Sequence, residues 1–210
     1  MQAFTKVGLE ALLTPENCVL LLIDHQPFQL ANVNSHEPTM VINNVTALAK
    51  TAKAYGIPTI LTTVNEERGG VIFKQVQAVF PDQKPINRTF INSWEDRRVV
   101  EAIKRTGRKK LIIAALWTEM CLAMPAIHAM GEGYDVYVVT DASGGASPEA
   151  HDMAIRRLVA AGALPRHARY VCEEPAADPG NCVTELYLAR SLHDTCGAGS
   201  GTGLRADVRL

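Results

Sequence analysis

Short apolar runs recur along the chain, separated by stretches with the periodicity of amphipathic helices. The first run covers residues 17–23 (NCVLLLI) and ends at Asp24. A continuous apolar run of this length is typical of a parallel strand that is buried on both faces. By the same pattern, further strands are predicted at residues 57–64, 110–116, 134–140 and 163–172.

Between these runs, apolar residues recur at the spacing of one helix face. In residues 41–55 the side chains of Val41, Val45 and Leu48 share a face, and Gly56 follows as a stop signal. Other helices are predicted at residues 95–106, 118–130, 148–161 and 183–193. Strands that alternate with helices imply βαβ units. We therefore predict an α/β fold: a doubly wound, mainly parallel β-sheet with helices on both faces, a Rossmann-like three-layer αβα arrangement.

Composition narrows the classes of function. A length of 210 residues suits one domain, and 47% hydrophobic residues exclude disorder as the main state. With 21 basic and 22 acidic side chains the formal net charge is −1. This balance argues against a nucleic-acid-binding or polybasic membrane-binding protein, which would show a basic stripe. No apolar run is long enough for a transmembrane helix, and no secretory signal is visible. We expect one cytoplasmic domain over residues 1–196, followed by a mobile Gly-rich tail over residues 197–210.

Three segments are predicted to lie at the carboxyl ends of the strands, where open parallel sheets bind ligands, and a fourth stretch stands out as loop-like. Asp24 closes the first strand. Residues 116–121 (LWTEMC) follow the third, and residues 141–147 (DASGGAS) follow the fourth. Residues 88–94 (RTFINSW) read as a loop between the second and third strands.

Cys121 is the candidate nucleophile among five cysteines, none of which forms the C-x-x-C pair of a zinc ribbon or a thioredoxin site. It falls in the first turn of a predicted helix, three residues after Thr118, a candidate N-cap. The helix dipole and free backbone N–H groups there stabilise a thiolate, so we expect its pKa to fall from about 8.5 toward neutrality. The alternative is a small apolar residue that packs the helix on the sheet.

Asp24 and Arg88 are the candidate acid and cation. If Asp24 lies beside Cys121, burial would raise its pKa and let it accept the thiol proton. The alternative for Asp24 is an N-cap or a structural hydrogen-bond acceptor, and for Arg88 an ordinary surface arginine. Sequence position alone leaves these alternatives open.

The order and spacing of these segments resemble the isochorismatase-like cysteine hydrolases over about residues 17–172. LLIDHQP matches the family's aspartate motif at Asp24, and LIIAALWTEMCL matches its cysteine motif at Cys121. The segments DHQ, INSW and TEMC look most like the YcaC-like branch. The resemblance implies an isochorismatase-like fold with a catalytic triad of Asp24, Arg88 and Cys121. It also implies a cis peptide between Leu116 and Trp117, and an oxyanion hole formed by the backbone N–H groups of Trp117 and Cys121.

This chain departs from the family pattern at the middle member of the triad, because Arg88 stands where the family has a lysine. Lys84 falls outside the register and ranks second. An arginine does not give up a proton near neutral pH, so Arg88 could stabilise an anion but not shuttle protons. From the resemblance we expect hydrolysis of an amide-like C–N bond in a small molecule through an acyl-enzyme. The alternative is a binding or scaffold protein whose catalysis is weakened by Arg88.

The remaining candidates are aromatic residues and histidines. Phe28, Trp94 and Trp117 are expected to line the substrate pocket, although aromatics at strand edges often serve packing alone. His25 follows Asp24 directly and is read as structural rather than catalytic. His128 lies two helical turns beyond Cys121, too far to act as its base, whereas His151 remains an alternative base.

We predict neither a metal nor a cofactor. No D-x-H or comparable cluster is present, and the glycine pairs do not follow strands in a phosphate-binding pattern. The near-neutral charge fits a small-molecule substrate and no nucleic acid. The family resemblance further implies a homo-oligomer, an octamer in the YcaC-like branch.

Overall fold

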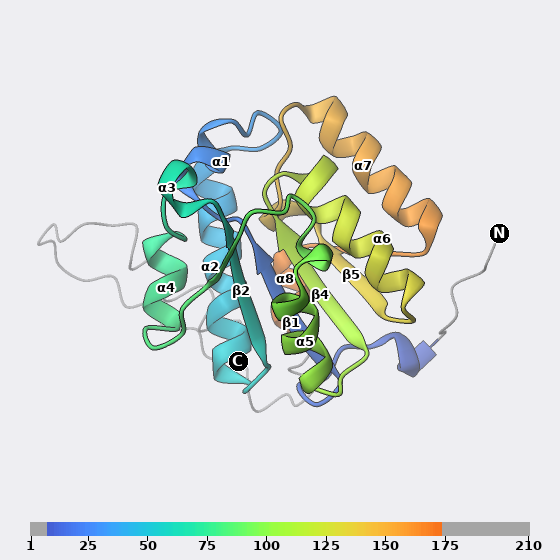
Figure 1. Ribbon diagram of the computed structural model, residues 1–210. Helices are drawn as coiled ribbons and strands as arrows, with labels where there is room; N and C mark the ends of the chain where they lie inside the picture. Colours follow the sequence, from blue (N-terminus) through green and yellow to red (C-terminus); the bar gives the residue numbers. More distant parts are fainter. Residues whose placement is uncertain (1–7, 174–210) are drawn as a thin grey trace, which may run out of the picture.

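The computed structural model describes residues 8–173, in which six parallel strands form one sheet in the order β3-β2-β1-β4-β5-β6 (Figure 1). Every neighbouring pair in this sheet is parallel, which confirms the predicted α/β class. The strands are β1 (Cys18–Ile23), β2 (Thr59–Val64), β3 (Ile86–Arg88), β4 (Lys110–Ala115), β5 (Asp135–Val139) and β6 (Leu164–Arg166).

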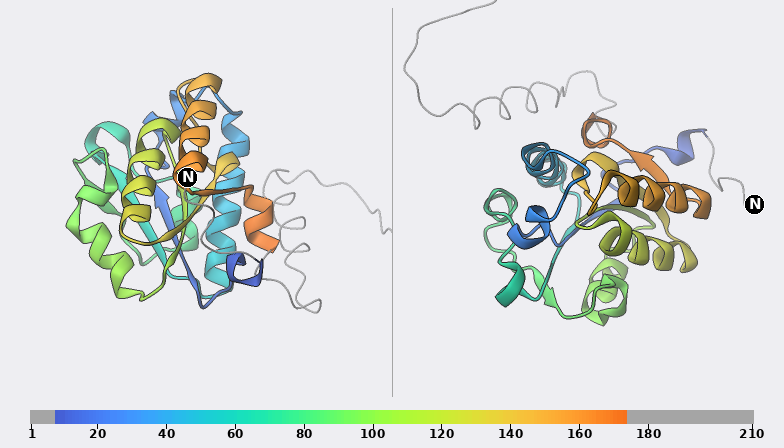
Figure 2. Two further views of the ribbon diagram at one scale, coloured as in Figure 1. Left: turned by 90° about the vertical axis from the view of Figure 1, so that its right-hand side faces the viewer. Right: turned by 90° about the horizontal axis from the view of Figure 1, so that it is seen from above.

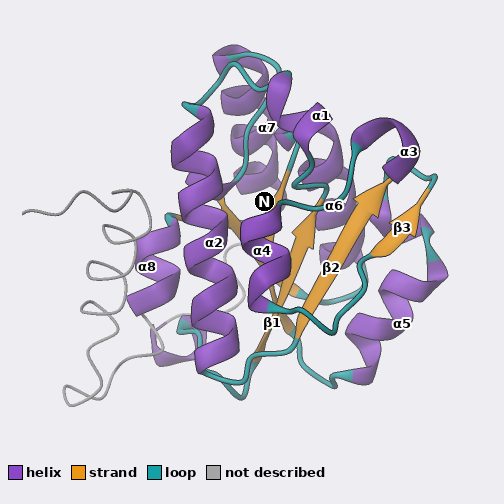
Figure 3. Ribbon diagram, turned by 90° about the vertical axis from the view of Figure 1, so that its left-hand side faces the viewer, coloured by secondary structure: helices purple, strands orange, loops and turns teal. Residues whose placement is uncertain are grey.

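Helices cover both faces of the sheet, as Figure 2 shows from above. The α-helices are α1 (Pro27–Ala31), α2 (Pro38–Ala54), α3 (Glu66–Gly69), α4 (Lys74–Val79), α5 (Arg97–Arg105), α6 (Ala123–Gly131), α7 (Pro148–Ala161) and α8 (Ala168–Glu173). Helices α2, α4 and α8 pack on one face (Figure 3), and α5, α6 and α7 pack on the other. Single helical turns are η1 (Gly8–Ala11), η2 (Ser93–Glu95), η3 (Thr118–Leu122) and η4 (Thr140–Ala142).

The apolar run of β1 is continuous because both of its faces are covered. Leu20 and Leu22 contact the core on the α2 side, whereas Leu21 and Ile23 contact the core on the α6 side. All six residues of β1 are buried, and the same holds for β4. Burial of each such aliphatic side chain stabilises the fold by about 1.5–3 kcal/mol. The two central strands therefore form a rigid base for the residues at their carboxyl ends.

Three predicted elements differ in the structure. Residues 163–172 do not form one strand: β6 ends at Arg166, and α8 begins at Ala168, whose N–H donates to the Asp141 side chain at 2.7 Å. The helix predicted from residue 118 begins instead with the π-helical turn η3. The short strand β3 lies partly in the segment read as a loop.

Other sequence predictions concern parts of the chain that the structure does not describe. The helix predicted at residues 183–193 and the tail at residues 197–210 lie outside the described residues. Within residues 8–173, no helix has the length and apolar character needed to cross a membrane.

Candidate active site

The candidate site lies where β1 and β4 run side by side, at the switch point of the strand order. Asp24 follows β1, and η3 with Cys121 follows β4 after two intervening residues. The predicted segment at residues 141–147 reaches the same place, since Gly144 forms a parallel bridge with Leu116. The topology thus brings together segments that are far apart in the sequence.

The backbone turns sharply at Asp24 and buries its carboxylate. Asp24 has φ of 57°, in the left-handed region that few residues other than glycine adopt. Its N–H donates to the Thr62 carbonyl at 3.0 Å, and its own carbonyl accepts from the Gln26 N–H at 2.7 Å. The Gln26 side chain in turn accepts from the Val64 N–H at 2.8 Å, which holds the turn against β2. The DHQ segment is therefore a fixed turn that directs Asp24 into the interior.

Arg88 reaches Asp24 from two strands away. It ends β3, and its guanidinium Nη2 donates to Asp24 Oδ2 with both side chains fully buried. Its Nη1 donates to the carbonyls of Phe90 and Ile91, the latter at 3.0 Å. Lys84, the second-ranked cation, is exposed and precedes the amino end of β3. The cation of this site is therefore Arg88.

The environment of Cys121 is the opposite of what the sequence predicted. Burial and, after it, the Asp24 charge raise the pKa of its thiol to about 12, against the lowering effects of Arg88 and the Trp117 N–H. The expected low pKa is therefore wrong, because burial and a neighbouring carboxylate outweigh the helix terminus. Thr118 is also not an N-cap: Trp117 takes that position, and its side chain caps nothing.

Asp24 and Cys121 form a proton acceptor and donor side by side. Burial raises the pKa of Asp24 from 3.8 to about 6, although the Arg88 charge and the Cys121 thiol both lower it. The acid is thus mainly charged at pH 7 while the thiol is neutral. The second carboxylate oxygen, Oδ1, is buried and has no hydrogen-bond partner of its own among the described residues.

The backbone N–H of Trp117 lies against the sulfur of Cys121. The N–H groups on either side are engaged elsewhere, from Leu116 to the Ile23 carbonyl at 3.1 Å and from Thr118 to the Gly144 carbonyl at 2.9 Å. The Trp117 N–H instead interacts with the thiol and lowers its pKa. The peptide bond between Leu116 and Trp117 is cis. A donor that already faces the Cys121 sulfur suits the predicted oxyanion hole.

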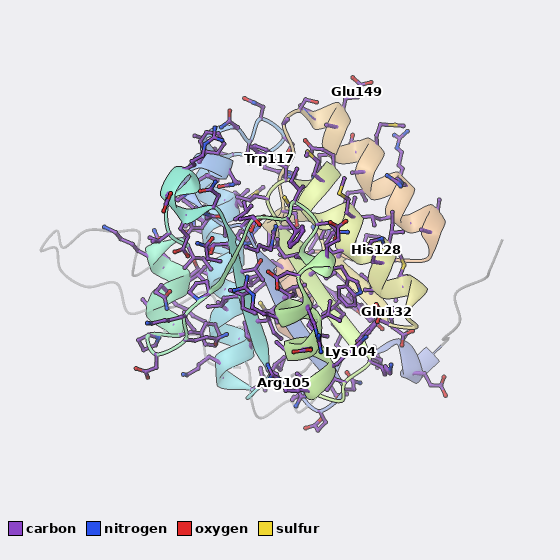
Figure 4. The ribbon with its side chains drawn as sticks, in the orientation of Figure 1. Lys104, Arg105, Trp117, His128, Glu132 and Glu149 are labelled. Atoms are coloured by element: carbon purple, nitrogen blue, oxygen red, sulfur yellow. The ribbon has the colours of Figure 1, made fainter. Side chains whose placement is uncertain are left out.

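Two of the three predicted pocket aromatics lie together. The ring centroids of Phe28 and Trp117 are 6.4 Å apart, and the Trp117 indole N–H donates to the Gln29 carbonyl at 2.8 Å. Phe28 is half exposed. These two rings, from α1 and from the residue before η3, lie on the carboxyl-end side of the sheet, where Figure 4 labels Trp117.

The third aromatic, Trp94, is not part of this group. Its ring packs on Tyr134 with centroids 5.5 Å apart, and its indole N–H donates to Glu132 at 2.8 Å. Glu132 follows the carboxyl end of α6, whereas Cys121 precedes the amino end of that helix, and Figure 4 shows Glu132 well away from Trp117. Trp94 thus packs in the core beneath α6 rather than beside Phe28 and Trp117.

The histidines are held in structural contacts. His25 is buried with its Nε2 2.9 Å from the Ala142 carbonyl, and burial lowers its pKa to about 4. The exposed His128 is hydrogen-bonded to Asn92. His151 is hydrogen-bonded to the Thr118 hydroxyl at 2.8 Å rather than to Cys121, and burial lowers its pKa. His151 therefore anchors the turn that carries Cys121, a role that the sequence pattern did not indicate.

The DASGGAS segment fastens this turn from the other side. Glu119 accepts a hydrogen bond from the Ala146 N–H at 3.0 Å, and the Gly145 N–H donates to Ser35 at 2.9 Å. A Cβ at Gly145 would lie 2.7 Å from Glu119 Oε2, and one at Gly144 would lie 2.7 Å from Val33. The glycine pair is needed for close packing. Within residues 8–173 no group of three or more His, Cys, Asp or Glu side chains is arranged to hold a metal ion.

Comparison with known proteins gives matches over most of the chain. Residues 18–168 match the model of the isochorismatase domain. The protein named Probable hydrolase YcaC of Escherichia coli (strain K12) is 44% identical over 153 residues, which cover 72% of this chain and 74% of that protein.

Solved structures give the same picture. The crystal structure of Escherichia coli YcaC, an octameric hydrolase of unknown specificity, has a TM-score of 0.83 at 39% identity and covers 90% of this chain and 94% of that one. YcaC from Pseudomonas aeruginosa, solved with hexane-2,5-diol and covalent acrylamide, has a TM-score of 0.82 at 35% identity and covers 89% and 96%.

Proposed function

Because the chain belongs to the isochorismatase family, as its motifs predicted, we propose that it hydrolyses an amide-like C–N bond of a small molecule with Cys121 as the nucleophile. It is a YcaC-like hydrolase of unknown specificity. The observation that carries the proposal is the charged Asp24 carboxylate beside the neutral Cys121 thiol in a buried site. A base in its accepting form next to a nucleophile in its donating form is the arrangement that acyl transfer requires.

The first step is proton transfer coupled to attack. As Cys121 sulfur bonds to the carbonyl carbon, Asp24 takes the thiol proton and the carbonyl π electrons move to the oxygen. The high thiol pKa means that the thiolate forms only during this step and is not a resting species. Arg88 stabilises the charged acid before transfer and keeps its own proton throughout.

The oxyanion is stabilised by backbone donors, and Asp24 then returns the proton. The N–H groups of Trp117 and Cys121 are the proposed donors, each contributing about 10²–10³ in rate in comparable sites. Collapse of the intermediate breaks the C–N bond, and Asp24 protonates the departing nitrogen. Water then attacks the thioester while Asp24 accepts its proton, which releases the acid and restores the thiol.

Acrylamide is a suitable first probe of this site. It is both a primary amide and an electrophile toward sulfur, and the Pseudomonas aeruginosa relative was solved with it in covalent form. Adduct formation at Cys121 would report nucleophilicity without any knowledge of the natural substrate. We also propose that the chain forms a homo-oligomer, because the Escherichia coli relative is octameric.

The proposal is tested by combining adduct mapping with turnover. Intact-protein and peptide mass spectrometry should locate the acrylamide adduct at Cys121, and a panel of primary amides and nitriles should reveal ammonia release. Cys121→Ser should abolish both. Cys18→Ser is the matched control, because Cys18 is equally buried but lies at the opposite end of β1, where it donates to the Thr14 carbonyl.

Two outcomes would contradict the proposal. Ammonia release that survives Cys121→Ser would exclude Cys121 as the nucleophile. Absence of both adduct and ammonia release would favour the alternative, a binding or scaffold protein in which Arg88 has weakened catalysis.

A further inference from the structure

Four buried polar atoms near Asp24 have no hydrogen-bond partner among the described residues. They are Asp24 Oδ1, Arg88 Nε, Thr62 Oγ1 and Ser93 Oγ. The side chains of Thr62 and Ser93 belong to residues with no exposed surface. Buried polar groups in native proteins are almost always paired, with protein or with an ordered water, because an unpaired one is costly. Four such atoms in neighbouring segments therefore point to a shared partner.

Thr62 and Arg88 lie on the same face of the sheet as Cys121. Side chains alternate along a strand, so Thr62 shares a face with Ile60, and Arg88 shares a face with Ile86. Ile60 belongs to the core cluster that contains Cys121, and Ile86 packs against it. Thr62 also lies beside Asp24, whose N–H donates to the Thr62 carbonyl.

The course of the Arg88 side chain brings its Nε above β2. Strand β2 lies between β3, which carries Arg88, and β1, which precedes Asp24. Neighbouring strands are about 4.8 Å apart, so a side chain that spans from β3 to Asp24 crosses β2 on this face. In the β2–β3 register Arg88 pairs with Val64, two residues beyond Thr62. Arg88 and Thr62 thus lie on the same face of the sheet, two register positions apart, and each has a buried polar atom without a partner among the described residues.

Ser93 lies in the loop that follows β3, on the same side of the sheet as Cys121. The carbonyls of Phe90 and Ile91 accept hydrogen bonds from Arg88, which draws the loop over the guanidinium. Ser93 then begins η2, which lies against α5 and α6 on the Cys121 side of the sheet. Ser93 is two residues after Ile91, whose carbonyl accepts a hydrogen bond from Arg88.

We propose that these four atoms bind an ordered water molecule that links the Thr62 hydroxyl to Asp24 Oδ1, so that Thr62 and Ser93 are positioning residues for the catalytic base. The water accepts a hydrogen bond from Arg88 Nε–H and donates one to Asp24 Oδ1. Its second donor and second acceptor position are used by the hydroxyls of Thr62 and Ser93. The hydrogen bond to Oδ1 stabilises the charged carboxylate and holds it toward the thiol. The inference rests on the proposed function in one respect: it takes Asp24 as the base that accepts the proton of Cys121.

The test compares Thr62→Val with Thr63→Val. Valine preserves the shape of threonine and removes only the hydroxyl. Thr63 is equally buried on the next position of β2, but its hydroxyl donates to Glu66 at 2.7 Å, on the opposite face. The readout is the rate of acrylamide labelling of Cys121 between pH 5 and 8. Thr62→Val should move the acid limb of this profile upward by about half a pH unit or more, because the carboxylate loses a donor.

Further arms make the result decisive. Thr62→Ser keeps the hydroxyl and should restore the wild-type limb, and Thr63→Val should leave it unchanged. Coincident limbs for Thr62→Val and wild type would overturn the inference. If wild-type Cys121 takes up no acrylamide, the proposed function fails and a high-resolution crystal structure decides the inference instead. A water within hydrogen-bond distance of Thr62 Oγ1 and Asp24 Oδ1 supports it, and protein atoms filling that position refute it.

Discussion

The Arg88 guanidinium donates a hydrogen bond to the Asp24 carboxylate, and both side chains are fully buried although β2 separates their strands. A buried charge of this kind is tolerated because its partner is present. Removal of one member of such a pair leaves the other uncompensated, which typically costs about 3–5 kcal/mol. The pair therefore ties the ionisation of the proposed base to a residue at the edge of the sheet.

Replacement of Arg88 by Met should raise the pKa of Asp24 above its present value of about 6, because the Arg88 charge now lowers it. The acid limb of acrylamide labelling should move to higher pH, with a loss of thermal stability. Arg88→Lys restores a positive charge and the family pattern, so its acid limb should lie close to that of the wild type. An Arg88→Met profile that superimposes on the wild-type profile would show that Arg88 does not set the ionisation of the acid.

The rate of Cys121 labelling should follow the ionisation of Asp24. With a pKa of about 6, the charged fraction of Asp24 rises about tenfold between pH 5 and pH 7. The labelling rate should rise by the same factor and then level off, since the thiol itself titrates only near pH 12. Asp24→Asn should remove this limb and slow labelling at pH 7 by about 10²-fold or more. A rate that keeps rising between pH 7 and 9 would identify direct thiol ionisation instead.

The central strands and the order of the site segments could be predicted from the sequence because both have local signatures. The apolar runs of β1 and β4 reflect burial on both faces. Asp24 follows the first of these runs directly, and Cys121 lies six residues after Ala115, the last residue of the second. Arg88 was identified because it stands at the position of the lysine in the family pattern. What the sequence could not supply was the depth of the site, and this is why the pKa of Cys121 was predicted in the wrong direction.

Other details depend on contacts that carry no local sequence signal. Helix α8 begins where a strand was expected because the Asp141 side chain, far back in the chain, accepts from its first N–H. Trp94 lies near the site segments in the sequence, but its indole N–H donates to Glu132, just after the carboxyl end of α6. The anchoring of Thr118 by His151 joins two segments that no periodicity connects.

Substitution of Gly145 by Ala should destabilise the protein by about 1–3 kcal/mol, because a Cβ there meets Glu119 Oε2 at 2.7 Å and the His151 N–H nitrogen at 3.1 Å. The loop would shift against the turn that carries Cys121, so labelling should slow as well. Gly131→Ala is the control: nothing lies within 4 Å of its Cβ, and in α6 the change should be neutral or stabilising. Equal unfolding temperatures for the two variants would contradict this account of the glycine.

The 210-residue chain should elute as an assembly in size-exclusion chromatography with light scattering. By analogy with the octameric Escherichia coli relative, the expected mass is eight times the 22.8 kDa of one chain. The distribution of assemblies should not change in Cys121→Ser, because the Cys121 side chain is buried within one chain. A single species of 22.8 kDa at micromolar concentration would refute the proposed oligomer.

Asp24 and His25 should make opposing contributions to acid stability. Burial lowers the pKa of His25 to about 4, so on acidification the unfolded chain takes up this proton first and stability falls between pH 6.5 and 4. Burial raises the pKa of Asp24 to about 6, so the folded protein takes up that proton first and stability rises over nearly the same range. Each effect amounts to about 3 kcal/mol, and in the wild type they largely cancel.

Asp24→Asn removes the contribution of Asp24 to acid stability and leaves that of His25. On going from pH 7 to pH 4, the variant should lose about 3 kcal/mol more of its free energy of unfolding than the wild type, as measured by urea denaturation at several pH values. His25→Asn should shift the difference in the opposite direction, which provides the internal control. Other titrating groups are shared by the three proteins and drop out of the comparison. Parallel curves of unfolding free energy against pH for wild type and Asp24→Asn would mean that the Asp24 carboxyl has the same pKa in the folded and unfolded states. That result would contradict the proposal that Asp24 is a buried base with a raised pKa.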